Sequence, residues 1–154
     1  MRARTVPQPL ASLIAIGAKK LDCWPWPTSY RGLIAIHAAS RLSQHGHEFS
    51  LWPPIHKVLA GAGLADPEAL PLGEIVGIVN VTETRQLHLA DLASIPAWER
   101  QLGDYKVGSW LVSFGGDVHR APRPIPAVGQ RGLWEWHLPS DVAPWWQAAA
   151  AGVP

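Results

Sequence analysis

Residues 19–37 hold most of the side chains in this chain that could do chemistry. Lys19 and Asp22 lie three residues apart, so the carboxylate can hold the ammonium group. A lysine whose pKa is lowered by partial burial can act as a base, although an acidic neighbour opposes that lowering. Tyr30 adds a phenolic hydroxyl further along the segment. We therefore take Lys19, Asp22 and Tyr30 as the candidate catalytic residues.

The same segment has rings suited to a flat ligand. Trp24 and Trp26 alternate with Pro25 and Pro27 in "WPWP". The prolines restrict the backbone, so a tryptophan ring can be held at a fixed angle with little entropy lost on binding. Stacking of a nucleobase on an aromatic ring contributes about 1–3 kcal/mol. Both tryptophans are candidate ligand contacts.

Further residues extend the candidate binding site. Thr28 offers a hydroxyl group and Arg31 a guanidinium, while Gly32 permits close approach of the backbone. His37 can exchange protons near neutral pH, although a histidine inside a strand more often has a structural role. Together with Ser109, these four residues complete the predicted set of ligand contacts.

The cysteine and histidine content does not indicate a metal site. Cys23 is the only cysteine, which excludes an internal disulfide and a cysteine-based zinc site and suits a reducing cytoplasm. No residue near it in sequence is a dedicated base, so a structural role is favoured over a nucleophilic one. His45 and His47 form a close pair without acidic partners, which favours a solvated loop over a zinc site. There is no Gly-rich phosphate loop, and we expect no cofactor.

Composition limits the elements that can position these residues. The chain has 154 residues, the size of one ordinary domain, and 15 of them are prolines. So many prolines oppose a bundle of long helices and favour short strands and loops. The formal net charge of +1 excludes the overall basic field typical of strong non-specific nucleic-acid binders, but leaves a local basic patch possible.

The pattern of the first half predicts two short helices and a strand. Residues 9–19 are expected to form a helix, with Pro9 in its first turn and Gly17 at its end. Residues 32–38 read as a strand and 52–64 as a second helix, while residues 39–50 look helical up to Gly46 and irregular after it. The apolar run 10–16 is too short to span a membrane and lacks a following cleavage signal, so we expect a cytoplasmic protein without a membrane segment.

The second half predicts mainly strands. Residues 74–87 have the strongest strand pattern, and 91–104 are expected to be a loop with a short helical piece. Residues 115–117, Gly-Gly-Asp, predict a hairpin turn, and the prolines of residues 121–132 predict an extended connection. Trp134 and Trp136 share one face of a closing strand, where packing against the first helix is favoured over ligand stacking. Trp145 and Trp146 are expected to dock on the domain. The elements indicate an α+β fold or a small barrel with helices around it.

The order of residues 8–39, "QPLASLIAIGAKKLDCWPWPTSYRGLIAIHAA", closely resembles the ASCH domain of the PUA-like superfamily. "LGDYKVGSWLVSF" and "PRPIPAVGQRGLWEW" resemble later parts of the same family, so the likeness covers roughly residues 8–136. The matching positions of the first motif are Gln8, Pro9, Ala11, Gly17, Lys19, Trp26, Thr28, Tyr30, Arg31, Gly32, Ile36, His37 and Ala38. We expect a single domain over residues 1–154, with a core of about 8–138 and a C-terminal tail.

Three residues depart from the family pattern. Leu10 replaces a tryptophan, Asp22 stands where glutamate is common, and Trp24 stands where arginine is usual. The loss of that arginine weakens any clamp on phosphate or carboxylate. Stacking at Trp24 is therefore easier to defend than phosphate binding.

The resemblance implies a PUA-like, twisted and partly closed β-barrel with short helices around a cleft. The family's cleft is proposed to bind RNA or a modified nucleobase. One branch is an amidohydrolase of acetylated cytidine that uses a lysine, a threonine and a glutamate, and another member is reported to cleave RNA. Its lysine corresponds to Lys19, its threonine falls at Asp22, and its glutamate has no counterpart that we can place.

Three functional hypotheses remain open at the level of sequence. The first is a module that binds RNA or a modified nucleobase or nucleoside. The second is a hydrolase, either a ribonuclease or a nucleoside amidohydrolase, using Lys19 and Asp22 with Tyr30 or Ser109. The third is a regulatory domain that binds a protein partner. The low net charge makes a small ligand in a deep cleft at least as plausible as a long RNA.

Overall fold

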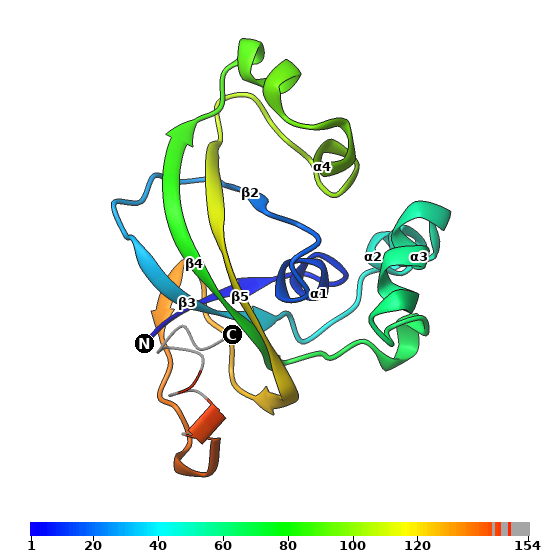
Figure 1. Ribbon diagram of the computed structural model, residues 1–154, viewed down its shortest axis with the longest axis vertical. Helices are drawn as coiled ribbons and strands as arrows, with labels where there is room; N and C mark the ends of the chain where they lie inside the picture. Colours follow the sequence, from blue (N-terminus) through cyan, green and yellow to red (C-terminus); the bar gives the residue numbers. More distant parts are fainter. Residues whose placement is uncertain (143, 146–147, 149–154) are drawn as a thin grey trace.

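A single curled sheet of six strands forms the centre of the molecule (Figure 1). The structure is a computed structural model that describes residues 1–142, 144–145 and 148. The strand order is β2-β5-β4-β3-β1-β6. The strands are β1 (Arg2–Val6), β2 (Leu21–Trp24), β3 (Gly32–Ala38), β4 (Glu74–Gln86), β5 (Trp110–Pro126) and β6 (Leu133–Glu135). The sheet curls into a half-barrel with short helices around it, which confirms the predicted α+β class with a twisted, partly closed barrel.

Short helices surround the sheet. They are α1 (Leu10–Ala15), α2 (Gln44–Leu51), α3 (Pro53–Gly61) and α4 (Ala97–Gln101), with 3-10 turns at Pro67–Ala69, Leu89–Ser94 and Ser140–Val142. The expected helices within 9–19 and 52–64 and the helical piece within 91–104 are all present. The expected loosening after Gly46 is wrong, because α2 continues through that residue. Ser43 caps α2 and accepts a hydrogen bond from the Gly46 amide at 2.9 Å.

The start of α1 is held by the side chain of Gln8. Its Oε1 accepts a hydrogen bond from the Ser12 amide at 3.0 Å, and its Nε2 donates to the Ser12 hydroxyl at 2.8 Å. These bonds satisfy a backbone donor that a helix N-terminus otherwise leaves unpaired. The buried residues of α1 then pack on the sheet, with Ala11 and Ile14 joining the core around Ile34 and Ile36 of β3.

The first strand and its pairing were not predicted from the sequence. Residues 2–6 read as a basic N-terminus in the sequence, yet β1 pairs in parallel with β3 and antiparallel with β6. Ala3 and Val6 of this strand are buried. The parallel partner of β1 lies about 30 residues later in the chain, so the pairing leaves no local sequence signal. The five residues of β1 are also too few to show a clear alternation of apolar and polar side chains.

The closing tryptophans lie on the face of the sheet opposite to α1. Trp134 pairs with Ala3, and Trp134 and Trp136 pack with Ala35 and Ile75 in a second core. Alternation along β3 places Ala35 on that face and its neighbours on the face of α1. Core packing is therefore correct for these tryptophans, but the expected contact with the first helix is wrong. Trp145 also packs on this second core, as expected, and Trp146 lies outside the described residues.

The predicted hairpin at residues 115–117 is wrong, because β5 runs straight through it. Val79 pairs with Val118 and Val81 with Phe114, so residues 115–117 stand opposite Asn80 alone. Such extra residues form a bulge, which bends the strand without ending it. The chain reverses instead through residues 87–109, a long excursion between β4 and β5.

The Pro-rich segment 121–132 is only partly a connection, because its residues 121–126 belong to β5. Its residues 121–124 stand opposite Val76 alone, in a second irregularity of the β4–β5 ladder. Pro122 and Pro124 therefore need not donate to a regular ladder. In addition, β2 pairs only with residues 110–113 of β5, so β2 does not extend along this part of the strand.

Candidate functional site

A cavity of about 180 Å³ lies between β1, α1, β2 and the excursion 87–109. At about 30 Å³ per molecule, it has room for roughly six waters. Its polar lining includes Arg4 of β1, Lys19, Asp22 of β2, and Asp104 and Tyr105 of the excursion. Of the predicted site residues, Lys19 and Asp22 line this cavity.

Lys19 is almost completely buried, with 2% of its surface exposed. Its Nζ donates a hydrogen bond of 2.8 Å to the Tyr105 hydroxyl and lies 4.7 Å from the centre of that ring. Gly103 packs directly beside it, because a Cβ at that position would lie 2.8 Å from Nζ. Burial lowers the pKa of the Lys19 ammonium, and the nearby carboxylates of Asp22 and Glu99 oppose that lowering.

Glu99 of α4 fixes the backbone that follows Lys19 and the side chain of Tyr105. Its Oε1 accepts hydrogen bonds from the backbone amides of Lys20 and Leu21, at 3.0 and 2.8 Å, and from the Tyr105 hydroxyl at 3.1 Å. The same oxygen lies 3.9 Å from the Nζ of Lys19. Burial and the Glu99 carboxylate raise the pKa of the Tyr105 phenol far above its usual range. Tyr105 therefore stays protonated, donating to Glu99 and accepting from Lys19.

Sequence reasoning missed both Glu99 and Tyr105. One signal for Glu99 was present, since Ile95 and Leu102 lie four residues before it and three after it. That spacing places all three on one face of a helix, and the two apolar residues are buried. An acidic residue on such a face must find donors inside the protein.

Asp22 of β2 is the second predicted site residue in the lining of the cavity. Its Oδ2 accepts a hydrogen bond of 3.1 Å from the indole nitrogen of Trp24. Burial raises the pKa of the Asp22 carboxyl, and the positive charges of Lys19 and Arg4 oppose that rise. The cavity thus places one carboxylate between two cations.

Arg4 is a site residue that sequence reasoning missed, because the strand that carries it was not predicted. Its guanidinium carbon lies 5.2 Å from the ring centroid of Trp24 and 5.3 Å from that of Trp26. Its Nε is buried and has no hydrogen-bond partner among the described residues. Burial lowers the pKa of the Arg4 guanidinium, which the charge of Asp22 opposes. A cation from β1 therefore lies against the rings of both tryptophans.

The two tryptophans support this arginine differently. Trp24 is fully buried in the core beside α1, and Trp26 is partly exposed and packs against that core. Their ring centroids are 4.9 Å apart and the planes are tilted by 54°. The structure thus leaves Trp24 no open face for a stacked ligand, whereas Trp26 keeps part of its ring accessible.

Other predicted site residues lie outside the lining of this cavity. The Tyr30 hydroxyl donates to the Leu33 carbonyl at 2.8 Å, and the Thr28 hydroxyl accepts from the Tyr30 amide at 3.1 Å. Arg31 is exposed, and its Nη1 donates to the Tyr30 carbonyl at 2.8 Å. Gly32 begins β3 with a φ of 116°, which other residues rarely adopt. These bonds brace the turn before β3.

His37 and Ser109 also lie away from Lys19. His37 is 1% exposed, and its ring nitrogens contact the Thr5 hydroxyl at 3.2 Å and the Ala127 carbonyl at 2.9 Å. It lines a separate hollow of about 470 Å³ beside residues 127–131. The Ser109 hydroxyl donates to the Lys106 carbonyl. The structure therefore does not bring these two residues together with Lys19.

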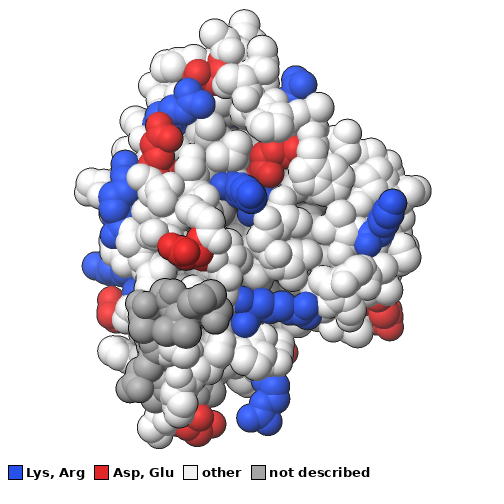
Figure 2. Space-filling view, viewed as in Figure 1, with Lys and Arg blue, Asp and Glu red and all other residues white. Residues whose placement is uncertain are grey.

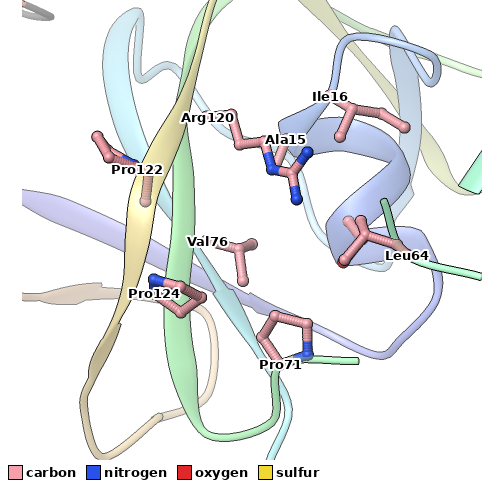
Figure 3. Close-up of a pocket in the computed structure, with 10 residues that line it drawn as sticks. Ala15, Ile16, Leu64, Pro71, Val76, Arg120, Pro122 and Pro124 are labelled. Atoms are coloured by element: carbon pink, nitrogen blue, oxygen red, sulfur yellow. The ribbon is translucent and has the colours of Figure 1, made fainter. Parts of the chain in front are cut away.

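Neither the surface charge nor a smaller hollow offers a better candidate site than the Lys19 cavity. Figure 2 shows Lys and Arg scattered among acidic residues over one face, without a continuous basic patch. A hollow of about 50 Å³ lies between α1 and the Pro-rich part of β5, where Arg120 points toward α1 and donates to the Ala62 carbonyl at 2.7 Å (Figure 3). That space holds fewer than two waters at about 30 Å³ each.

The described part of the chain contains neither a candidate metal site nor a membrane-spanning helix. Within residues 1–142, 144–145 and 148, no three His, Cys, Asp or Glu side chains are grouped so that they could hold a metal ion. In the same part of the chain, no helix is long and apolar enough to cross a membrane.

Comparison with known proteins identifies the fold. No family model and no curated protein matches the sequence. Among solved structures, the chain is similar to the ASCH protein from Zymomonas mobilis, with a TM-score of 0.55 and 14% sequence identity. The match covers 96% of this chain and 93% of that one. The curled six-stranded sheet and its surrounding helices are thus those of an α+β, PUA-like fold, and the chain has the fold of an ASCH domain.

Proposed function

We propose that the cavity around Lys19 binds a nucleobase or nucleoside, either free or as part of an RNA. The observation that carries the proposal is the placement of Arg4, Lys19 and Asp22 around one small cavity. Two cationic donors and a carboxylate acceptor match the mixed donors and acceptors on the edge of a base. The ASCH fold agrees with this ligand class through the sequence resemblance to a family proposed to bind RNA.

The unpaired donor of Arg4 adds a reason for a ligand. A buried polar group without a partner costs about 1–3 kcal/mol. An acceptor on a bound ligand would relieve that cost at the Nε of Arg4, which has no partner among the described residues. The tilted rings of Trp24 and Trp26 hold the guanidinium in place, so it loses little freedom on binding.

Size and charge favour a small binding unit. The cavity of about 180 Å³ is below the range of about 300–1,000 Å³ for pockets that bind drug-sized ligands. The net charge of +1 and the interspersed surface charges give little long-range attraction for a polyanion (Figure 2). Binding through one base in the cavity fits these features better than binding along a long basic surface.

A hydrolase is the second candidate, favoured by the lowered pKa of buried Lys19. A neutral lysine can take a proton from an attacking water. The carboxylates of Asp22 and Glu99 oppose that neutral form, so binding is the better-supported role. Release of acetate from acetylated cytidine, or of fragments from RNA, would measure the activity. A Lys19→Met protein with full turnover would remove Lys19 as the base.

The binding proposal is tested by calorimetry with nucleosides, methylated and acetylated nucleosides, and single-stranded hexaribonucleotides. Arg4→Gln and Lys19→Met should each weaken binding by about tenfold or more, since a hydrogen bond to a charged group contributes about 1.5–3 kcal/mol. Arg2→Gln and Lys20→Met are matched controls, because both residues are exposed neighbours of the site residues. The proposal would be overturned if none of the probes bound saturably to the folded protein. It would also be overturned if the control variants lost as much affinity as Arg4→Gln and Lys19→Met.

A further inference from the structure

A second, larger hollow adjoins the Lys19 cavity. It measures about 590 Å³ and lies between α2 and the excursion 87–109. We call it the outer groove. Pro7, Leu10, Gly103 and Asp104 line both the outer groove and the Lys19 cavity. The two spaces therefore meet along a shared border, and a ligand in one can continue into the other.

Aromatic side chains of α2 line the outer groove. His45 and Phe49 both face it, and their rings are parallel with centroids 6.3 Å apart. Trp52, which follows α2 and does not line the groove, packs on the far side of Phe49, with ring centroids 6.2 Å apart and planes inclined by 22°. A planar base can stack on the exposed ring of His45, which lies parallel to that of Phe49, whatever its sequence identity.

The groove has a firm base. Gly46 lies between the two aromatic residues and packs so closely on the chain that a Cβ there would lie 2.5 Å from the Gln8 carbonyl oxygen. The same glutamine is fixed by its bonds to Ser12. Because α2 is pressed onto this fixed point, the rings are held ready for a ligand, which reduces the entropy lost on binding.

We propose that the outer groove holds the nucleotide next to the one in the Lys19 cavity, so that the ligand is single-stranded RNA of at least two nucleotides. This inference rests on the proposed function and extends it from a base to a chain. The inner cavity, about a third as large as the groove, suits one base, and the groove offers rings for a second. Ser43 and Gln101 give the groove polar atoms for ribose or phosphate.

The charge at the border is compatible with a phosphodiester. Asp104 would repel a phosphate, but its carboxylate is paired with Lys106 at 3.5 Å. Lys19 lies at the same border, since its Nζ packs against Gly103. A phosphate at this border would therefore lie near the ammonium groups of Lys19 and Lys106 as well as the carboxylate of Asp104.

Competition experiments test the inference with the four ribonucleoside monophosphates and the matching dinucleotides as probes. The best dinucleotide should bind about tenfold more tightly than its mononucleotide, the gain expected from stacking one more base. Phe49→Leu keeps apolar volume but removes the ring, and should abolish that gain without changing mononucleotide affinity. His45→Ala removes the other ring of the groove, and because His45 is exposed, this change should not affect folding. Trp98→Ala, an exposed aromatic on α4 that lines neither space, should change nothing.

The outcomes separate this inference from the proposed function. If mononucleotides bind but the dinucleotides bind no more tightly, the groove is not a nucleotide site and the proposed function stands. Equal losses in Phe49→Leu and Trp98→Ala would also overturn the groove. If neither kind of probe binds to the folded protein, the proposed function itself is overturned, and the groove with it.

Discussion

The guanidinium of Arg4 lies against the ring of Trp24, with the central carbon 5.2 Å from the ring centroid. The two residues come from different strands, β1 and β2. The sequence pattern that residues 8–39 resemble usually has an arginine at the position of Trp24, and in this structure an arginine from β1 lies against that ring. The positive charge at this place therefore comes from residue 4 of β1 and not from residue 24 of β2.

Arg4→Met should separate binding from stability. The change removes an unpaired buried donor, which costs about 1–3 kcal/mol, and also a cation–π contact of about 0.5–2 kcal/mol. Because these effects oppose each other, the free energy of unfolding should stay within about 1 kcal/mol of the parent while nucleoside affinity falls. Chemical denaturation and calorimetry measure the two quantities. A large loss of stability, absent in the exposed Arg2→Met control, would contradict this view of Arg4.

Glu99→Ala should destabilise the fold strongly. It leaves two backbone amides and the Tyr105 hydroxyl without their acceptor. The expected loss is about 3 kcal/mol, in the range for breaking a buried charged network. Glu99→Gln keeps a side-chain oxygen as acceptor and should lose much less. Denaturant unfolding checks both variants against Glu83→Ala, an exposed residue, and similar losses for Gln and Ala would argue against the anchoring role.

Asp22 should make stability fall as the pH rises. Burial raises the pKa of its carboxyl in the folded state above the ordinary 3.8. The folded protein therefore binds the proton more tightly than the unfolded chain, so this contribution to stability is present below about pH 4 and is lost as the pH rises through the folded pKa.

Asp22→Asn removes this titratable group and tests the direction of the pH dependence of stability. Its unfolding free energy should rise relative to the parent as the pH increases from about 4 to about 8. The indole nitrogen of Trp24 can still donate to the oxygen of the asparagine side chain. Unfolding curves at several pH values measure the difference, with the exposed Asp117→Asn as control. A difference that falls with increasing pH would refute the assignment.

Gly103→Ala should weaken ligand binding while leaving the fold intact. The new methyl group would lie 2.8 Å from the Nζ of Lys19 and push the ammonium aside. Because the loss of one hydrogen bond costs about 0.5–1.5 kcal/mol, affinity should fall by about two- to tenfold. Gly116→Ala is the matched control, since nothing lies within 4 Å of a Cβ there. Unchanged affinity in Gly103→Ala would show that this amine does not contact the ligand.

The parts of the structure that follow from local pattern were predictable. The apolar periodicity of α1, the strand patterns of β3 and β4, and the short apolar run of β6 all depend on neighbours in sequence. The continuity of β5 was not predictable in the same way. A Gly-Gly-Asp turn and a bulge have the same local composition, and only the pairing with β4 decides between them.

The candidate site likewise contains residues that local spacing predicts and residues that only the tertiary structure brings in. The spacing of Lys19 and Asp22 suggested that they act together, and both line the cavity. The parallel pairing of β1 brings Arg4 to them, and the excursion 87–109 brings Glu99 and Tyr105. Local pattern predicts a short helical piece in that excursion but not its contact with Lys19. Thr28 and Tyr30 lie close in sequence to Lys19, but the strand direction carries them to another part of the surface.

The excursion between β4 and β5 has a consequence for how such a cleft can change over time. It supplies Gly103, Asp104 and Tyr105 to one wall, and Glu99 supports that wall through its hydrogen bond with Tyr105, yet the excursion belongs to none of the paired strands. Insertions or substitutions there can reshape the wall while the strand registers stay the same. Ligand preference can therefore diverge among proteins of this fold through one interchangeable segment, and transplanting residues 87–109 between relatives is a direct route to re-engineering it.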